Sequence, residues 1–132
     1  MKARCFESAN ISLKLTMKLS NASFLLTSVY GPTEDSLKTM FLDELIDCQP
    51  TAGTAWLCLG DFNLIYEARD KNNNNINRRL MGRFRRALDA SELMELRLQN
   101  RRYTWSNGRA QPTLVHLDRV FCNKEWDAIF QL

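Results

Sequence analysis

AWLCLGDFN, residues 55–63, is the stretch of this chain that decides the fold. Its first five residues are apolar and have the length and composition of a strand buried in a sheet. The next four, Gly60-Asp61-Phe62-Asn63, place an acid and an amide two residues apart directly after that strand. Such residues are also common in ordinary turns, so a structural interpretation stays open. The catalytic interpretation is phosphate-ester chemistry, in which one side chain orients an attacking water and the other holds a phosphate oxygen.

The segments before this stretch predict a hairpin followed by a helix. Apolar and polar residues alternate over residues 11–19, which is typical of a half-buried strand. A turn at Asn21 and a second, more apolar run at residues 23–30 complete an antiparallel hairpin. Thr33 is a suitable N-cap, and apolar residues then recur at helical spacing up to about Cys48.

The segments after it predict a loop, a second helix and several short strands. Residues 69–77 are polar and include four consecutive asparagines, which predicts a surface loop. Residues 77–90 have the apolar spacing of a helix. The remaining elements expected are strands at 95–98, 103–106 and 114–121, and a helical turn at 124–130. This order of elements predicts an α/β or α+β protein built on one layered sheet.

Composition indicates a globular protein with one core. Hydrophobic residues make up 45% of the 132 residues and charged residues 25%, which is ordinary for such a domain. No apolar run approaches the roughly 20 residues needed to span a bilayer, and the N-terminus does not resemble a secretory signal. The four cysteines are far apart, so we expect reduced thiols and a nuclear or cytoplasmic location. A single histidine offers no ligand cluster for zinc, and a net charge of +3 does not by itself identify a nucleic-acid binder.

Four short segments in a fixed order carry a resemblance to a known family. They are VYGP at 29–32, GDFN at 60–63, RYTWSN at 102–107 and LDRVF at 117–121. Together they resemble the endonuclease/exonuclease/phosphatase family, which has the deoxyribonuclease-I-like fold. The chain is most similar to the endonuclease domain of plant LINE-type non-LTR retrotransposons, over nearly its whole length. The resemblance implies an α+β fold, the αββα four-layer sandwich, of which residues 1–132 would be a single partial domain lacking N-terminal strands and a C-terminal motif.

The resemblance also implies a role for each matching residue. Tyr30 matches the tyrosine that helps hold the phosphate, and Asp61 matches the aspartate that positions or activates the attacking water. Asn63 matches the asparagine that contacts the phosphate. Asp118 matches the aspartate that orients a catalytic histidine, and Thr104 matches a threonine near the site and the DNA backbone.

Basic residues supply further candidates for contact with DNA. Arg101, Arg102 and Arg109 lie closest in sequence to the residues above and are the better candidates for backbone contact. Residues 71–88 contain six basic and no acidic residues. This second cluster is either a patch for DNA phosphates or the solvated face of an amphipathic helix, and the nearly balanced overall charge favours the solvated face.

Each candidate also has a structural interpretation. Tyr30 could pack on the core as a strand-end aromatic residue, and Asp118 could be a surface carboxylate paired with a nearby arginine. Trp105 and Trp126 are more typical of core or edge packing than of base stacking. His116 could replace the catalytic histidine, because it would share a strand face with Asp118, but a partly exposed strand histidine is the commoner situation.

The chain departs from the family pattern in its metal ligands. The metal-binding Glu, an upstream Asn and the Ser-Asp-His motif of the family have no counterpart in the 132 residues. The family implies Mg²⁺ or Mn²⁺ as cofactor and DNA as partner, but Asp61 alone is a poor site for Mg²⁺. We therefore expect a remnant of a metal-dependent phosphodiesterase that is inactive as an isolated chain and marginally stable, with an apolar surface patch. The alternatives are a non-catalytic nucleic-acid-binding module and a phosphatase of the same family.

Overall fold

A mixed six-stranded sheet organises the molecule, whose computed structural model describes residues 3–5, 11–16, 22–97, 103 and 105–130. The strand order is β1-β2-β3-β4-β8-β5. The strands are β1 (Ala3–Cys5), β2 (Ile11–Thr16), β3 (Ser23–Tyr30), β4 (Trp56–Asp61), β5 (Met94–Leu96) and β8 (Asp118–Cys122). Strands β3 and β4 are parallel, and the other neighbouring pairs are antiparallel.

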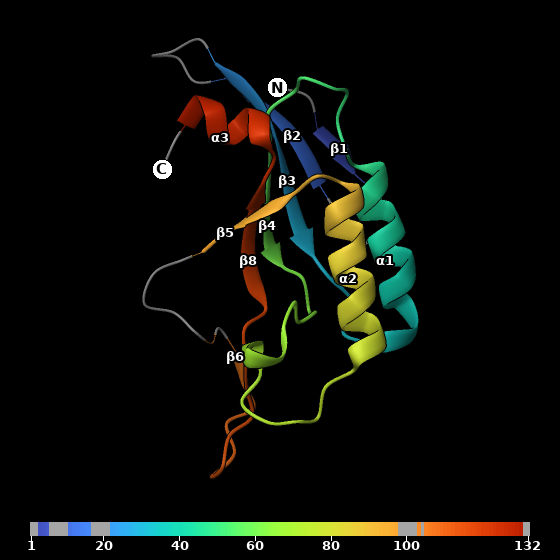
Figure 1. The fold of residues 1–132 in the computed structure, drawn as a ribbon, viewed down its shortest axis with the longest axis vertical. Helices are drawn as coiled ribbons and strands as arrows, with labels where there is room; N and C mark the ends of the chain where they lie inside the picture. Colours follow the sequence, from blue (N-terminus) through green and yellow to red (C-terminus); the bar gives the residue numbers. More distant parts are fainter. Residues whose placement is uncertain (1–2, 6–10, 17–21, 98–102, 104, 131–132) are drawn as a thin grey trace.

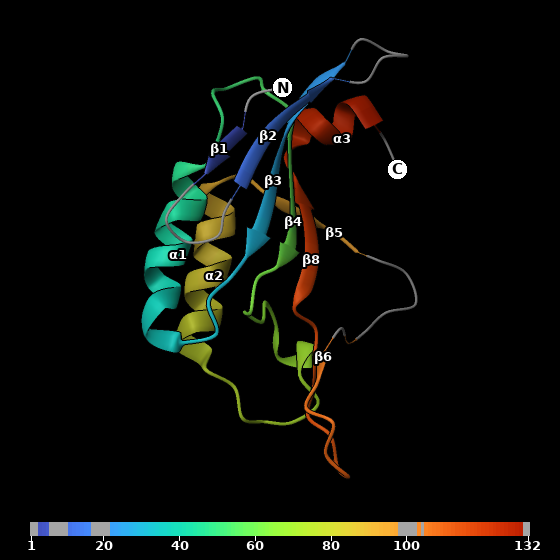
Figure 2. The ribbon, with the colours of Figure 1, turned by 180° about the vertical axis from the view of Figure 1, so that it is seen from behind.

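Helices cover the two faces of this sheet unequally. Helices α1 (Asp35–Asp47) and α2 (Arg78–Ala90) lie side by side on one face, as both ribbon views show (Figure 1, Figure 2). The short helix α3 (Lys124–Phe130) lies on the opposite side, near one end of the sheet (Figure 2). The prediction of an α+β fold is confirmed. Among the described residues, α1 with α2 and the six-stranded sheet form one helical layer and one sheet layer.

A small second sheet lies beyond one end of the large one. It consists of β6 (Trp105–Ser106) and β7 (Leu114–Val115), which form an antiparallel hairpin. A 3₁₀ helix, Ala68–Asp70, leads into a single bridge between Lys71 and Val115. The hairpin is thereby attached to the loop that follows β4.

The main core lies between the sheet and helices α1 and α2. Phe62 is fully buried at its centre, with its ring centroid 5.1 Å from that of Phe121, 5.5 Å from Phe84 and 6.4 Å from Phe41. Trp56 is also fully buried, and its indole N–H donates to the Thr27 hydroxyl over 2.9 Å. The GDFN tetrapeptide is thus anchored by an aromatic side chain that reaches the packed interior.

A smaller cluster lies under α3 on the other face of the sheet. Trp126, Cys122 and Ala55 are buried there, and the Trp126 and Phe130 rings are 4.9 Å apart. The core interpretation of Trp126 is therefore confirmed. Cys48, Cys58 and Cys122 are buried free thiols, as the spacing of the cysteines predicted. No helix in the described part of the chain is long and apolar enough to cross a bilayer.

Several boundaries differ from the predicted ones. The run 114–121 is two strands, because β7 pairs with β6 while β8 starts at Asp118 and pairs with β4. Helix α1 begins one residue later than expected, with Glu34 rather than Thr33 at the N-cap and no side-chain cap. The short strand β1 was not predicted.

Candidate active site

Three sequence-predicted residues meet at one edge of the sheet. Tyr30 ends β3, Asp61 ends β4 and Asp118 begins β8. Tyr30 is in register with Asp61 on the parallel side, and Asp61 is in register with Asp118 on the antiparallel side. Residues paired in this way project from the same face of a sheet. The three side chains therefore form a row across adjacent strands, which we call the Tyr30–Asp61–Asp118 row.

The row faces away from helices α1 and α2. The chain neighbours Val29 and Phe62 point into the core beneath those helices, so the alternation of side chains places the row on the opposite face. Tyr30 is 61% exposed and does not pack in the core, which excludes its structural interpretation. Asp118 is also exposed, and Asp61 between them is partly buried.

Two glycines let β3 and β4 approach closely beside the row. Gly60 has a φ of 140°, and a Cβ atom added to it would lie 2.0 Å from the Val29 carbonyl oxygen. A Cβ atom on Gly31 would lie 2.2 Å from the Phe62 carbonyl oxygen. Only glycine fits at these contacts, and Gly60 also has a backbone conformation that other residues rarely adopt. The glycine of GDFN is thus required to bring Asp61 beside Tyr30.

Asn63 closes the turn after Asp61. Its φ is 49°, in the left-handed region that asparagine tolerates better than most residues. Its backbone N–H donates to Asp61 Oδ1 over 2.9 Å, and its side-chain Nδ2 donates to the Gly31 carbonyl oxygen over 2.6 Å. Asn63 therefore fixes the Asp61 carboxylate and joins the ends of β3 and β4. One of its two amide protons is used in that bond, which leaves the other proton and Oδ1 to contact a substrate.

The pKa of Asp61 is raised above its ordinary value, chiefly by burial. The charge of Asp118 raises it further, while the Asn63 N–H and the charge of Lys38 act in the opposite direction. Like charges directly opposite each other in a sheet are destabilising. A carboxylate with a raised pKa is a better proton acceptor near neutral pH, which is the property that a residue activating water requires.

His116 does not share the row with Asp118, contrary to the prediction that both would lie on one strand face. It precedes β8, its backbone N–H donates to the Asp70 carbonyl oxygen over 2.7 Å, and its side chain is buried. Its Nε2 lies 3.8 Å from Glu95 Oε1. The expectation of a partly exposed strand histidine is therefore wrong as well, because His116 joins a buried charged cluster.

Arg119 is the centre of that cluster, and the sequence reasoning missed it. Its side chain is fully buried and forms ion pairs with Asp70 and, over 2.9 Å, with Glu95. Asp70 also accepts the backbone N–H of Tyr66 and Glu67, so it is buried rather than part of a surface loop as predicted. Arg119, the arginine next to Asp118 in the sequence, thus pairs with Asp70 and Glu95. One feature of the sequence could have indicated that Arg119 is buried. In a strand it lies on the same face as Phe121, a core residue two positions later.

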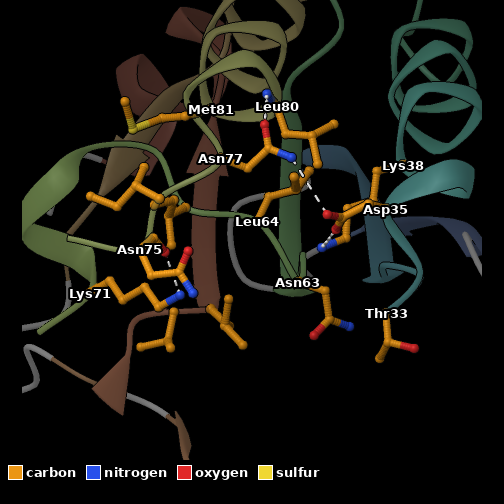
Figure 3. Close-up of a pocket in the computed structure, with 14 residues that line it drawn as sticks. Thr33, Asp35, Lys38, Asn63, Leu64, Lys71, Asn75, Asn77, Leu80 and Met81 are labelled. Carbon is orange, nitrogen blue, oxygen red and sulfur yellow. Dashed lines mark hydrogen bonds and ion pairs between the residues drawn. The ribbon is translucent and has the colours of Figure 1, made fainter. Parts of the chain in front are cut away.

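A pocket of about 430 Å³ lies between Asn63 and the N-terminal turns of α1 and α2 (Figure 3). Asn63 forms part of its wall, together with the first turn of α1, the start of α2 and residues 71–77. Lys38 and Asp35 form an ion pair of 3.0 Å at its edge, and Lys71 donates to the Asn75 carbonyl oxygen. Tyr30, Asp61 and Asp118 do not line it. The row lies outside the pocket, and Asn63, which lines the pocket and donates its backbone N–H to Asp61, connects the two.

Comparison with known families shows which family the chain belongs to. A profile of the endonuclease/exonuclease/phosphatase family matches residues 20–131, which include every residue of the row. The chain belongs to this family. Comparison with curated proteins finds no significant match.

Solved structures of other proteins share the fold of this chain. The endonuclease domain of TRAS1, a telomere-specific non-LTR retrotransposon, superimposes with a TM-score of 0.69 and 13% identity, over 88% of this chain and 51% of that domain. Beta toxin from Staphylococcus aureus gives a TM-score of 0.56, and its beta-hairpin deletion mutant 0.55. Both are 13% identical and cover 89% of this chain and 44% of theirs. At these identities the likeness concerns the fold alone, and the chain spans about half the length of the structures that it matches.

The predicted DNA contacts of this family member are only partly described. Thr104, Arg101 and Arg102 lie outside the described residues. Arg109 is exposed in the loop of the β6–β7 hairpin, where its backbone N–H donates to Asn107 Oδ1. That hairpin extends beyond the end of the sheet where β4 ends (Figure 1). A role of Arg109 in DNA contact stays a prediction.

The described residues offer few ligands for a metal ion. They contain no group of three or more His, Cys, Asp or Glu side chains that could hold one. Asp61 and Asp118 are opposed across β4 and β8, and their carboxylate oxygens are of the kind that Mg²⁺ prefers. These two residues fit part of a divalent-metal site and would need further oxygen ligands.

Proposed function

We propose that this chain carries the water-activating part of the active site of a DNA-nicking endonuclease from a retroelement. The observation that supports this most strongly is the Tyr30–Asp61–Asp118 row, in which a carboxylate with a raised pKa stands between a tyrosine and a second carboxylate. Membership of the family supports phosphodiester chemistry. The choice of a retroelement rests on the sequence resemblance and on the fold shared with the retrotransposon endonuclease domain.

The row suits in-line attack of water on a phosphodiester. Asp61 would orient the water and accept its proton, since burial has made its carboxylate more basic. The exposed Tyr30 hydroxyl would donate a hydrogen bond to a non-bridging phosphate oxygen, and Asn63 would contact another with its remaining amide atoms. Asp118 would orient a general acid that protonates the leaving oxygen.

Mg²⁺ or Mn²⁺ would neutralise charge on the phosphate and assist the leaving oxygen. Asp61 and Asp118 are the described residues that would contribute to holding it. Two carboxylates bind Mg²⁺ weakly, because this ion prefers six oxygen ligands and keeps several waters. We therefore propose that the isolated chain has no measurable nuclease activity, since losing members of a catalytic group reduces the rate by orders of magnitude.

Plasmid nicking tests this proposal. Supercoiled plasmid incubated with the purified chain and Mg²⁺ or Mn²⁺ should stay supercoiled. Metal-dependent nicking that disappears in Asp61→Asn would contradict the proposed inactivity while supporting the assignment of Asp61. Nicking that Asp61→Asn leaves unchanged would contradict the proposed role of Asp61.

A non-catalytic nucleic-acid-binding module is the second candidate, and the arginines of α2 favour it. Salt-sensitive binding of duplex DNA without cleavage is expected under both candidates. The alternative would be favoured if Asp61→Asn and Tyr30→Phe also leave the binding of a short dinucleotide, which cannot reach α2 from the row, unchanged.

A further inference from the structure

Helix α2 carries a set of arginines that the active-site row does not use. Between residues 71 and 88 the chain has six basic and no acidic residues, and five of the six are arginines within α2. The opposite side of the helix is fixed in the core by Leu80, Phe84, Ala87 and Leu88. The orientation of α2 is therefore set by packing, and its arginines are held towards the surface.

Four of these arginines form one face, which we call the α2 arginine face. They are Arg78, Arg79, Arg83 and Arg86. Arg78, Arg79 and Arg86 are exposed, and the first and last of them are separated by about 12 Å along the helix. Arg83 is partly buried and donates to the Thr39 hydroxyl over 3.1 Å. The fifth arginine, Arg85, lies over the Tyr66 ring and is not counted.

The face forms no ion pair in the described part of the chain, although α1 beside it is acidic. The acidic residues of the α1 region are Glu34, Asp35, Asp43, Glu44 and Asp47. Arg78, Arg79 and Arg86 are exposed and form no ion pair with a described residue, so their guanidinium groups are available to an external anion.

The sequence of α2 is unfavourable for a helix whose only role is structural. Arg78 and Arg79 occupy its first turn, where the helix dipole disfavours cations, and no acidic residue is present there. Arg79 and Arg83 are four residues apart, and Arg83 and Arg86 three, so both pairs of like charges repel on the same surface. Gly82 lies in the middle of the helix, where glycine is destabilising. Violations of local rules are expected at functional sites.

Gly82 has a further effect on the shape of this face. A Cβ atom added to it would lie 3.2 Å from Nη1 of Arg86. The guanidinium of Arg86 therefore lies over the glycine, which leaves room for it there. Guanidinium groups bind phosphate in a bidentate manner, so such a group held against the helix suits a phosphate backbone.

We propose that the α2 arginine face binds the sugar–phosphate backbone of duplex DNA, independently of base sequence. It lies on the face of the sheet opposite the Tyr30–Asp61–Asp118 row, so it engages a different segment of DNA from the one at the row (Figure 1). No aromatic side chain is present among the exposed residues of α2, and aromatic stacking is what single-strand binding needs. The choice of DNA over RNA rests on the proposed function.

Fluorescence anisotropy with the purified 132-residue chain and a random duplex of roughly 20 base pairs tests this proposal over about 50 to 200 mM salt. In the double variant Arg78→Gln/Arg86→Gln the affinity should fall by about tenfold, and the slope of log K against log salt should decrease by about two. Lys124→Gln, an exposed cation on α3, is the matched control and should have little effect. An affinity of the double variant equal to that of Lys124→Gln would overturn the proposal.

A second variant separates lost binding from lost folding. Arg79→Glu should weaken DNA binding at least as strongly, yet raise Tm by a few degrees, because an acid suits the first turn and pairs with Arg83 four residues later. Tighter binding of single strands or of duplex RNA than of duplex DNA would contradict the assignment to duplex DNA.

Failure of the α2 proposal can be distinguished from failure of the proposed function at the row. Asp61→Asn changes the row and Arg109→Gln changes the loop of the β6–β7 hairpin, so neither variant alters α2. Loss of affinity in Arg109→Gln with none in Arg78→Gln/Arg86→Gln would overturn the α2 proposal and leave the proposed function standing.

Discussion

Burial raises the pKa of Asp61, and the charge of Asp118 in the facing position adds to that shift. Because the folded-state pKa lies above the unfolded-state value, the ionised carboxylate lowers the stability of the fold at neutral pH. This loss is relieved as the pH falls through the folded-state pKa, since the folded protein then binds the proton first. The ionised carboxylate of Asp61, at the end of β4, therefore lowers the stability of the fold, as is common for residues kept for function.

Asp61→Asn should therefore raise Tm at pH 7 by about 2–4 °C. The amide oxygen of the new side chain can still accept the Asn63 N–H, so the turn should be kept. Thermal melts from neutral to acidic pH should show the gain shrinking as Asp61 of the wild type becomes protonated. Asp43→Asn on the exposed side of α1 is the control. A lower Tm for Asp61→Asn at every pH would show that the carboxylate stabilises the fold.

Gly60→Ala should be far more damaging than Gly53→Ala. Both residues have positive φ, but a Cβ atom at Gly60 would collide with the Val29 carbonyl oxygen whereas Gly53 has open space around it. We expect a loss of about 1 kcal/mol at Gly53 and more than about 3 kcal/mol at Gly60. Urea denaturation of both variants measures the difference, and equal losses would mean that β3 and β4 are not packed as closely as described.

The periodicity of apolar residues predicted most of the helices and strands. The hairpin of β2 and β3, the helices α1 and α2, and β4 ending in Asp61 follow from local patterns of apolar residues. The division of residues 114–121 into β7 and β8 did not follow, because each half pairs with a different partner far away in the sequence. The burial of Asp70 was missed for the same reason, since its partner Arg119 is 49 residues away.

Arg119→Met should destabilise the fold by about 3–5 kcal/mol, because Asp70 and Glu95 would remain buried without their cation. Adding Glu95→Gln should recover part of this loss by removing one of the two uncompensated charges. Free energies of unfolding from urea titrations test the pair of variants. If the single variant unfolds at the wild-type midpoint, the cluster does not hold β5, β8 and the loop after β4 together.

At the scale of the whole molecule, the meeting of Tyr30, Asp61 and Asp118 could be predicted only through the resemblance to a family. The three residues are far apart in the sequence, and no local pattern shows that their strands are neighbours. The structure adds the register that puts them in one row and the role of Asn63 in joining two strand ends. The structure also shows that this row and the α2 arginine face lie on opposite faces of the sheet. The sequence alone does not show which face of the sheet a helix covers.

Apolar residues on the sheet face that carries the row are partly exposed, which indicates limited stability. Leu26, Leu57, Leu59 and Val120 are only partly buried on it, although α3 covers one end. We expect a purified chain to melt below about 60 °C, towards or below the middle of the range for mesophile domains. A reversible, cooperative melt above that temperature would contradict this expectation and show that the described packing is sufficient.

The central claim is that the Tyr30–Asp61–Asp118 row binds a phosphodiester. The most direct measurement is an NMR titration of the ¹⁵N-labelled chain with a thymidine dinucleotide, which is too short to reach α2 from the row, with and without Mg²⁺. We expect Mg²⁺-dependent shifts of the amide signals of Gly31, Asp61, Asn63 and Asp118, and we expect these shifts to be lost in Asp61→Asn. Unchanged signals at these four residues, with shifts confined to other parts of the chain, would contradict the central claim.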